Sequence, residues 1–182
     1  MKEISVVIPA RESDIPLAQD LKDSIKDYVS DIIIYTRECK TIAQAKNEGF
    51  KLAKNDIVFF IDADVRLIGS IKDINLSEKY DQWVAYTHVC NVKDEFTDKC
   101  INMINSRNHF KMAAFPIGFY GITRDGFNKL GGFNEDITTG EEYDFTFRAA
   151  AARYNTCWIK NIKVVINRKI GIIRKESRLF ME

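Results

Sequence analysis

Histidine and cysteine are scarce in this sequence, which limits the metal and redox chemistry open to it. Its 182 residues contain two histidines and four cysteines. Two histidines are too few for a histidine-based zinc site without help from cysteine. The cysteines are scattered without a C-x-x-C pair, which indicates reduced thiols in a cytosol.

The sequence also lacks an excess of charge of either sign and any long apolar run. The net charge is +1, so no global field favours nucleic acid or an acidic partner. No apolar stretch approaches the roughly 20 residues of a membrane span. Lys2 and Glu3 lead directly into an apolar run, so no secretion signal is expected. With 46% hydrophobic residues, the composition fits one cytoplasmic globular domain over residues 1–166, with residues 167–182 as its basic tail.

Strand and helix patterns alternate through the first 60 residues. Apolar runs at residues 4–9, 32–35 and 57–61 predict strands that are buried on both faces. Between them, helical spacing predicts one helix from the cap Asp14 to about Ser30, and a second after the cap Thr41. This order predicts an α/β fold, a doubly wound, mostly parallel sheet with helices on both faces.

The second part of the chain is less regular. Residues 65–77 are weakly patterned, and we expect strands at 83–89, 117–123 and 158–166. Helices are expected over residues 95–112, 124–130 and 141–153, with a loop over 133–140. Gly118 and Gly121 would allow a close approach of the backbone. In the last helix, either Phe145 and Ala149 or Tyr143, Phe147 and Ala150 would face the core.

The chain has two acidic clusters. Asp62 and Asp64 follow the third strand, at the sheet edge where α/β proteins bind ligands. If the strand continued past Ile61, both side chains would point the same way and form oxygen ligands for Mg2+ or Mn2+. The alternative is a solvated turn. The second cluster, residues 141–144, opens a helix, where acids are also explained by the helix dipole.

Four motifs in this order resemble the family-two glycosyltransferases, whose catalytic domain has the GT-A fold. The motifs are VVIPA at residues 6–10, AQAKNEG at 43–49, DIVFFIDAD at 56–64, and LGGFNE at 130–135 followed by EEYDFTFR at 141–148. The resemblance implies one Rossmann-like GT-A domain that moves a sugar from a nucleotide-diphosphate sugar to a hydroxyl of a sugar, lipid-linked or protein acceptor.

The resemblance also implies roles for individual residues. The donor-binding positions would be Pro9, Ala10, Arg11, Tyr35, Thr36, Arg37, Lys46, Asn47, Asp62, Ala63 and Asp64. Asp62 and Asp64 would hold Mn2+ or Mg2+, which neutralises charge on the leaving diphosphate. Glu142 falls on the position of the catalytic base, with Glu141 and Asp144 as alternatives, and the reaction would invert the anomeric centre.

The sequence departs from the family's motifs at several positions, and these departures leave a second function open. The second strand ends in Tyr35, Thr36 and Arg37, without the acids that bind the nucleotide base in the family. This favours, as the alternative, a non-catalytic GT-A domain that binds a nucleotide sugar or a protein partner. A nucleotidyltransferase would want a Gly-rich loop after the first strand, which is absent. The family's Gln-x-x-Arg-Trp motif of polymer synthases is also absent, so transfer of single sugars is expected.

Three features have a structural explanation that is as simple as the functional one. Arg148 would orient a base carboxylate on the face of Glu141, or form a surface ion pair. Lys46 and Asn47 would lie near the donor, or on the surface of their helix. The basic tail would contact anionic lipid headgroups at a membrane surface, close over the donor phosphates, or be solvated.

Overall fold

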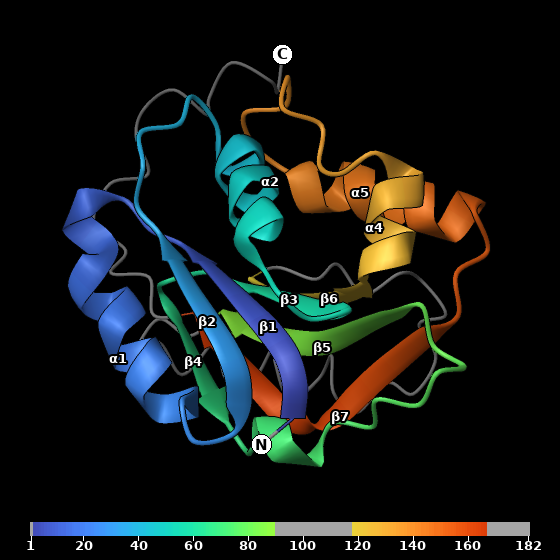
Figure 1. Ribbon diagram of the computed structural model, residues 1–182, viewed down its shortest axis with the longest axis horizontal. Helices are drawn as coiled ribbons and strands as arrows, with labels where there is room; N and C mark the ends of the chain where they lie inside the picture. The colour runs from blue at the N-terminus through green and yellow to red at the C-terminus, as the bar shows by residue number, and fades with distance from the viewer. Residues whose placement is uncertain (1, 90–117, 167–182) are drawn as a thin grey trace.

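A central sheet with helices on both faces makes up residues 2–89 and 118–166, the part of the chain that the computed structural model describes (Figure 1). The strands are β1 (Lys2–Pro9), β2 (Val29–Tyr35), β3 (Ile57–Ile61), β4 (Val65–Ile68), β5 (Gln82–Val89), β6 (Phe119–Thr123) and β7 (Thr156–Ile166). The helices are α1 (Ile15–Ile25), α2 (Ile42–Leu52), α4 (Arg124–Leu130) and α5 (Glu141–Ala151), with 3-10 helices η1 (Glu12–Asp14) and η2 (Ile71–Asp73). The predicted α/β fold is confirmed. The helix predicted over 95–112 and the basic tail lie outside the described residues.

The sheet joins a parallel part to a mixed part. Its seven strands lie in the order β2-β1-β3-β6-β5-β7-β4. β1 pairs in parallel with β2 and with β3, as the alternating strands and helices predict. Beyond β3, β6 runs antiparallel to both β3 and β5, and β7 is parallel to β5 but antiparallel to β4. The weakly patterned stretch after Asp64 contains β4, a strand too short to leave a clear periodicity.

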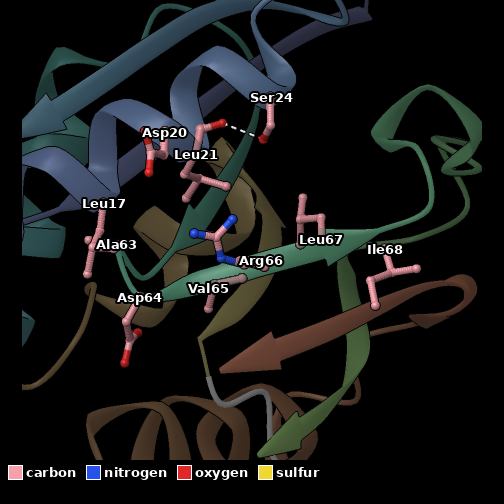
Figure 2. A pocket seen from close by; sticks show the side chains of 10 residues that line it. All are labelled: Leu17, Asp20, Leu21, Ser24, Ala63, Asp64, Val65, Arg66, Leu67 and Ile68. Atoms are coloured by element: carbon pink, nitrogen blue, oxygen red, sulfur yellow. Dashed lines mark hydrogen bonds between the residues drawn. The ribbon is translucent and has the colours of Figure 1, made fainter. Parts of the chain in front are cut away.

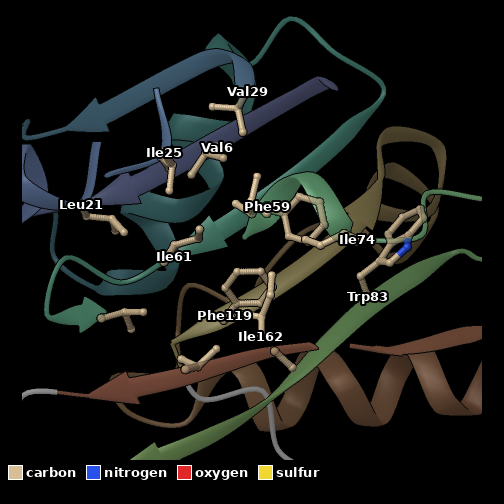
Figure 3. Close-up of a cluster of buried hydrophobic side chains, with 14 of the residues drawn as sticks. Val6, Leu21, Ile25, Val29, Phe59, Ile61, Ile74, Trp83, Phe119 and Ile162 are labelled. Atoms are coloured by element: carbon tan, nitrogen blue, oxygen red, sulfur yellow. The ribbon is translucent and has the colours of Figure 1, made fainter. Parts of the chain in front are cut away.

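Alternate side chains of β1 and β3 fill two separate cores, one on each face of the sheet. The first core packs under α1 (Figure 3) and includes Val6, Leu21, Ile25, Phe59, Ile61, Trp83, Phe119 and Ile162. The second packs under α2, α4 and α5 and includes Val7, Ala43, Phe50, Val58, Phe60, Tyr120, Phe127, Phe133 and Phe145. Because both faces are covered, these strands carry uninterrupted apolar runs.

The two predicted helix caps have different outcomes. The Thr41 hydroxyl accepts a hydrogen bond from the Gln44 amide at 3.1 Å, so this cap is confirmed. Asp14 precedes α1, but its side chain makes no capping hydrogen bond. The prediction that this helix runs to about Ser30 is wrong, because α1 ends at Ile25 and Val29 already pairs with Lys2 at the start of β2.

Helix α5 presents one of the two faces that its pattern allowed. Phe145 and Ala149 are fully buried, whereas Tyr143 and Phe147 are 37% and 59% exposed. The first turn of α5 carries Glu141 on the same face as Phe145, so the buried face of this helix begins with a carboxylate.

Gly121 allows the close approach of strands that its position in β6 predicts. A Cβ atom at Gly121 would lie 2.4 Å from the ring of Phe59, directly opposite in β3. Phe59 is fully buried between Trp83 and Phe119, with ring centroids 6.1 and 5.4 Å away, so its ring could move aside only by disturbing this packing. None of the helices in the described ranges is long and apolar enough to cross a membrane.

We expect Gly121→Ala to lower the free energy of unfolding by about 2 kcal/mol, because overpacking forces the Phe59 ring from its place. For a chain of this size, the melting temperature would fall by roughly 4–8 °C in a thermal unfolding experiment. The control is Gly131→Ala, where nothing lies within 4 Å of an added Cβ and only the left-handed backbone, at φ 76°, opposes it at a cost of about 1 kcal/mol. Equal melting temperatures for Gly121→Ala and wild type would contradict this close packing of Gly121 against Phe59.

Candidate active site

A buried lysine and three carboxylates form a charged cluster among the described residues. The ammonium nitrogen of Lys46 lies 2.8 Å from Glu141 Oε1, 2.5 Å from Glu142 Oε1 and 3.4 Å from Asp62 Oδ1. It also lies 5.4 Å from the centre of the Phe133 ring. Both acidic clusters of the sequence therefore meet at one lysine.

Local packing explains how α2 delivers this lysine. Gly49 lies against β1, where an added Cβ would be 2.4 Å from Val7 Cγ1. Together with the fully buried Ala43, this small-residue face lets α2 approach the sheet closely. From there the Lys46 side chain reaches Asp62 at the end of β3 and Glu141 and Glu142 in the first turn of α5.

Burial and charge determine the ionisation of this cluster. Lys46 is 1% exposed, and burial alone would lower its pKa, but the attraction of Asp62, Glu142 and Glu141 outweighs burial and raises the pKa above its usual value. Burial raises the pKa of Glu142 to about 7; Lys46 opposes this rise, and the negative charges of Asp62 and Glu141 add to it. A carboxylate poised near neutral pH is suited to accept a proton in catalysis.

The Asp62–Asp64 segment does not continue the strand. The Val65 amide donates a hydrogen bond to the Asp62 carbonyl oxygen at 3.1 Å, which closes a turn directly after Ile61. The strand alternation that would point both carboxylates the same way therefore ends at Ile61, and that argument from the sequence is wrong. Asp62 faces Lys46, whereas Asp64 lines a hollow between α1 and β4. Figure 2 shows its carboxylate pointing away from Arg66 and from α1.

Asp62 is suited to bind a metal ion. Its Oδ1 atom is buried and accepts no hydrogen bond, although the Lys46 ammonium lies within ion-pair distance. The nearest cation to Oδ1 is that ammonium group, so the exposed part of the Asp62 side chain, 28% of it, is what could reach a metal ion. Within residues 2–89 and 118–166, no three His, Cys, Asp or Glu side chains are grouped to hold a metal. Such a cation would need further oxygen ligands from a bound phosphate or water, as is usual for Mg2+.

The predicted donor-binding residues of β1 and β2 lie at the same edge of the sheet as Asp62. Pro9 and Tyr35 are paired neighbours, and the Ala10 amide donates to the Tyr35 carbonyl oxygen at 2.9 Å. Thr36 and Arg37 are exposed, as is Arg11. The Tyr35 side chain is only 7% exposed, so its ring packs inside the protein. Of the residues that end β2, Thr36 and Arg37 are the ones open to a ligand.

Asn47 fastens a loop to α2. Its amide nitrogen donates to the Phe133 carbonyl oxygen at 2.9 Å and to Glu135 Oε1 at 2.8 Å, and its oxygen accepts from the Phe133 amide at 2.9 Å. Gly132 makes room for it, because a Cβ there would lie 2.9 Å from Asn47 Oδ1. Asn47 and Lys46 are therefore both engaged inside the protein and are not plain residues of the helix surface.

Arg148 does not contact Glu141. Its guanidinium donates to Asp144 Oδ2 at 2.9 and 2.7 Å, and to the carbonyl oxygens of Leu130 and Gly132 at 2.6 and 2.8 Å. The suggestion that Arg148 orients a base carboxylate on the face of Glu141 is thus wrong. Asp144 is held away from the Lys46 cluster, and the cation beside Glu141 and Glu142 is Lys46. The sequence had pointed to Lys46 through the AQAKNEG motif, as a donor-binding position and not as the partner of these acids.

Solved structures share this arrangement of strands and helices. A Drosophila β1,4-galactosyltransferase 7 catalytic domain in complex with xylobiose superposes with a TM-score of 0.58 at 15% identity, covering 88% of this chain and 66% of that one. A mutant of the same enzyme with manganese, UDP-Gal and xylobiose gives 0.57 at 13% identity, covering 88% and 66%. A mannosyltransferase from Pyrobaculum calidifontis with GDP-Man and Mn2+ gives 0.60 at 15% identity, covering 93% and 58%.

These similarities define the class of fold. The described chain has the GT-A fold, and it spans two thirds or less of the length of the solved glycosyltransferases it resembles. No protein-family model and no curated protein sequence matches the chain.

The raised pKa of Glu142 predicts a pH-dependent difference in stability. Because the folded-state pKa of about 7 lies above the ordinary 4.5, the folded protein holds this proton more tightly than the unfolded chain does. The resulting stabilisation is full below about pH 4.5 and is lost as the pH rises to about 7. Glu142→Gln stays neutral, so with metal removed by chelator its free energy of unfolding should exceed that of wild type by at most about 3 kcal/mol at pH 8.

Denaturant titrations at pH 5, 6, 7 and 8 measure this difference. The control is Glu12→Gln, which removes an exposed carboxylate of η1 outside the Lys46 cluster. A difference between Glu142→Gln and wild type that does not grow with pH would show that Glu142 ionises normally.

Proposed function

We propose that this protein is an inverting glycosyltransferase of the family-two type, which moves a sugar from a nucleotide-diphosphate sugar to a hydroxyl acceptor with the help of a divalent metal. The observation that carries this proposal is the meeting of Asp62 with Glu141 and Glu142 at Lys46, at the carboxyl edge of β1, β2 and β3. Ligands bind at this edge in open α/β sheets. The GT-A fold and the order of the four motifs support the same assignment.

Among the acids of α5, Glu142 is best suited to be the base. The side chain of Glu141 is 5% exposed and that of Glu142 is 12% exposed, so Glu142 is the more accessible of the pair. Asp144 is committed to Arg148. A pKa of about 7 leaves Glu142 deprotonated in much of the protein at neutral pH, yet basic enough to take a proton.

The chemistry is one in-line displacement. Glu142 takes the proton of the acceptor hydroxyl as its oxygen attacks the anomeric carbon of the donor. The bond from that carbon to the diphosphate oxygen breaks, and its electron pair leaves with the nucleotide diphosphate. One base suffices, and the configuration at the anomeric carbon inverts.

The donor would lie along the edge formed by the ends of β1, β2 and β3. Thr36 and Arg37 are exposed there and could contact the nucleotide base, with Pro9, Ala10 and Arg11 beside them. The family resemblance assigns the divalent cation to Asp62 and Asp64, although only Asp62 faces the Lys46 cluster, and the cation would supply Lewis-acid neutralisation of the diphosphate. The related structures contain UDP-Gal with manganese and GDP-Man with Mn2+, so UDP- and GDP-sugars are the first donors to test. The acceptor class, sugar, lipid-linked or protein, stays open.

We expect release of nucleotide diphosphate from a UDP- or GDP-sugar only when Mn2+ or Mg2+ is present. Asp62→Asn and Asp64→Ala should each abolish this release and the metal-dependent rise in melting temperature that nucleotide diphosphates cause. The matched control is Asp125→Asn, which removes a surface carboxylate paired with Lys129 on α4 and should behave as wild type. Turnover that survives metal chelation would contradict the metal-assisted mechanism. Binding of nucleotide without turnover of any sugar would support the non-catalytic alternative.

Glu142→Gln should lower kcat by about 10²–10⁴-fold because the acceptor hydroxyl loses its general base. Nucleotide binding should persist, since the amide keeps the shape of the side chain. In wild type, kcat/KM should rise with pH up to about 7 and then level off, because the base must be deprotonated. Glu48→Gln, a surface change on α2, is the control. A fully active Glu142→Gln protein would show that another group is the base.

A further inference from the structure

Among the described residues, the polar contacts of the Lys46 side chain are with carboxylates. Its ammonium group has three donors; it donates to Glu141 and Glu142 and faces Asp62. The side chain is 2% exposed, so a donor phosphate could reach it only by displacing one of these acids. The Phe133 ring, 5.4 Å from the nitrogen, further encloses it.

The contacts of Lys46 join parts of the site that are far apart in the sequence. Asp62 ends β3, whereas Glu141 and Glu142 open α5, 95 and 96 residues after Lys46. Helix α2, which carries Lys46, is fixed to the sheet by the close contact of Gly49 with Val7. The position of Glu142 relative to Asp62 therefore depends on one side chain from a third element.

Electrostatics make that dependence strong. Three carboxylates around one point repel each other, and at low solvent exposure this repulsion is only weakly screened. Without the ammonium group, a carboxylate with some solvent exposure is free to turn away from the other two. Of the two acids of α5, that is Glu142, at 12% side-chain exposure against 5% for Glu141; Asp62, at 28%, is held by the turn that follows β3.

We propose that Lys46 is a positioning residue of the transfer reaction, which holds the Glu142 carboxylate in place relative to Asp62 and does not bind the donor phosphates. This proposal rests on the proposed glycosyl transfer. It differs from the donor-binding role that the sequence motif suggested, and it gives Lys46 the base-orienting role that the sequence had offered to Arg148. A misplacement of a reacting group by about 1 Å can cost roughly 10²-fold in rate.

The test compares Lys46→Met, Lys46→Arg and the control Lys51→Met in the full chain. Lys51 is an exposed lysine on the same helix, paired only with Glu48 among its described salt bridges. For each variant, kcat and the donor KM are measured with a UDP- or GDP-sugar that wild type turns over, and nucleotide diphosphate binding is followed by the rise in melting temperature in the presence of Mn2+.

We expect Lys46→Met to lose about 10²-fold in kcat. Its nucleotide binding and donor KM should stay within about twofold of wild type, since a residue that acts only on the reacting group leaves ground-state binding intact. Lys46→Arg, which keeps the charge, should have an intermediate kcat. Lys51→Met should match wild type. If Lys46→Met does not fold, Lys46→Met/Glu141→Gln removes one charge of each sign from the cluster and is expected to show the same loss in kcat.

Other outcomes would overturn the proposal in distinct ways. A weakened nucleotide affinity with unchanged kcat would make Lys46 a donor-binding residue. An unchanged kcat in Lys46→Met, or in the double variant, would show that the Glu142 carboxylate is positioned without Lys46. Absence of turnover in wild type with every sugar nucleotide would overturn the proposed function itself, and the positioning role with it.

Discussion

The contact of the Lys46 ammonium group with Asp62, Glu141 and Glu142 is the interaction on which the rest of the site depends. A buried charge is tolerated only where opposite charges and hydrogen bonds compensate its loss of hydration. Here the compensation is mutual, because the lysine stabilises acids that would otherwise repel each other. The end of β3, the middle of α2 and the first turn of α5 are joined at this point. The proposed function uses the same contact, since it leaves Glu142 ionisable near neutral pH.

Close packing around α2 makes this contact possible. Gly49 brings the helix onto β1, and Asn47 holds the loop after α4 through two hydrogen bonds with Phe133 and one with Glu135. Arg148 fixes the start of the same loop by donating to the carbonyl oxygens of Leu130 and Gly132. Asn47 and Arg148 therefore both hold the loop before α5 in place. Their role is to fix the start of the helix that carries Glu141 and Glu142.

Sequence reasoning succeeded where a local pattern has one physical meaning. The buried strands β1 and β3, the Thr41 cap, helix α4 and the close approach at Gly121 follow from apolar runs, capping chemistry and the missing Cβ of glycine. It failed at the end of α1, where the apolar Val29 fits both helical spacing and a strand, and pairing with β1 decided for the strand. It also missed the antiparallel pairing of β6, because the hydrophobic pattern of a strand does not show the direction in which the strand runs relative to its neighbours.

The sequence by itself determined the class of fold and the presence of two acidic clusters, because strand burial and motif order are properties of the chain. Only the tertiary structure decided which charged groups meet. The turn at Asp62 directs that carboxylate to Lys46, and the Arg148 side chain turns to Asp144 and two backbone carbonyls. Sequence spacing places residues on a helix face, but it does not say which opposite charge a third element brings there. The ion pairs of Lys46 join residues up to 96 positions apart, and only folding brings these into contact.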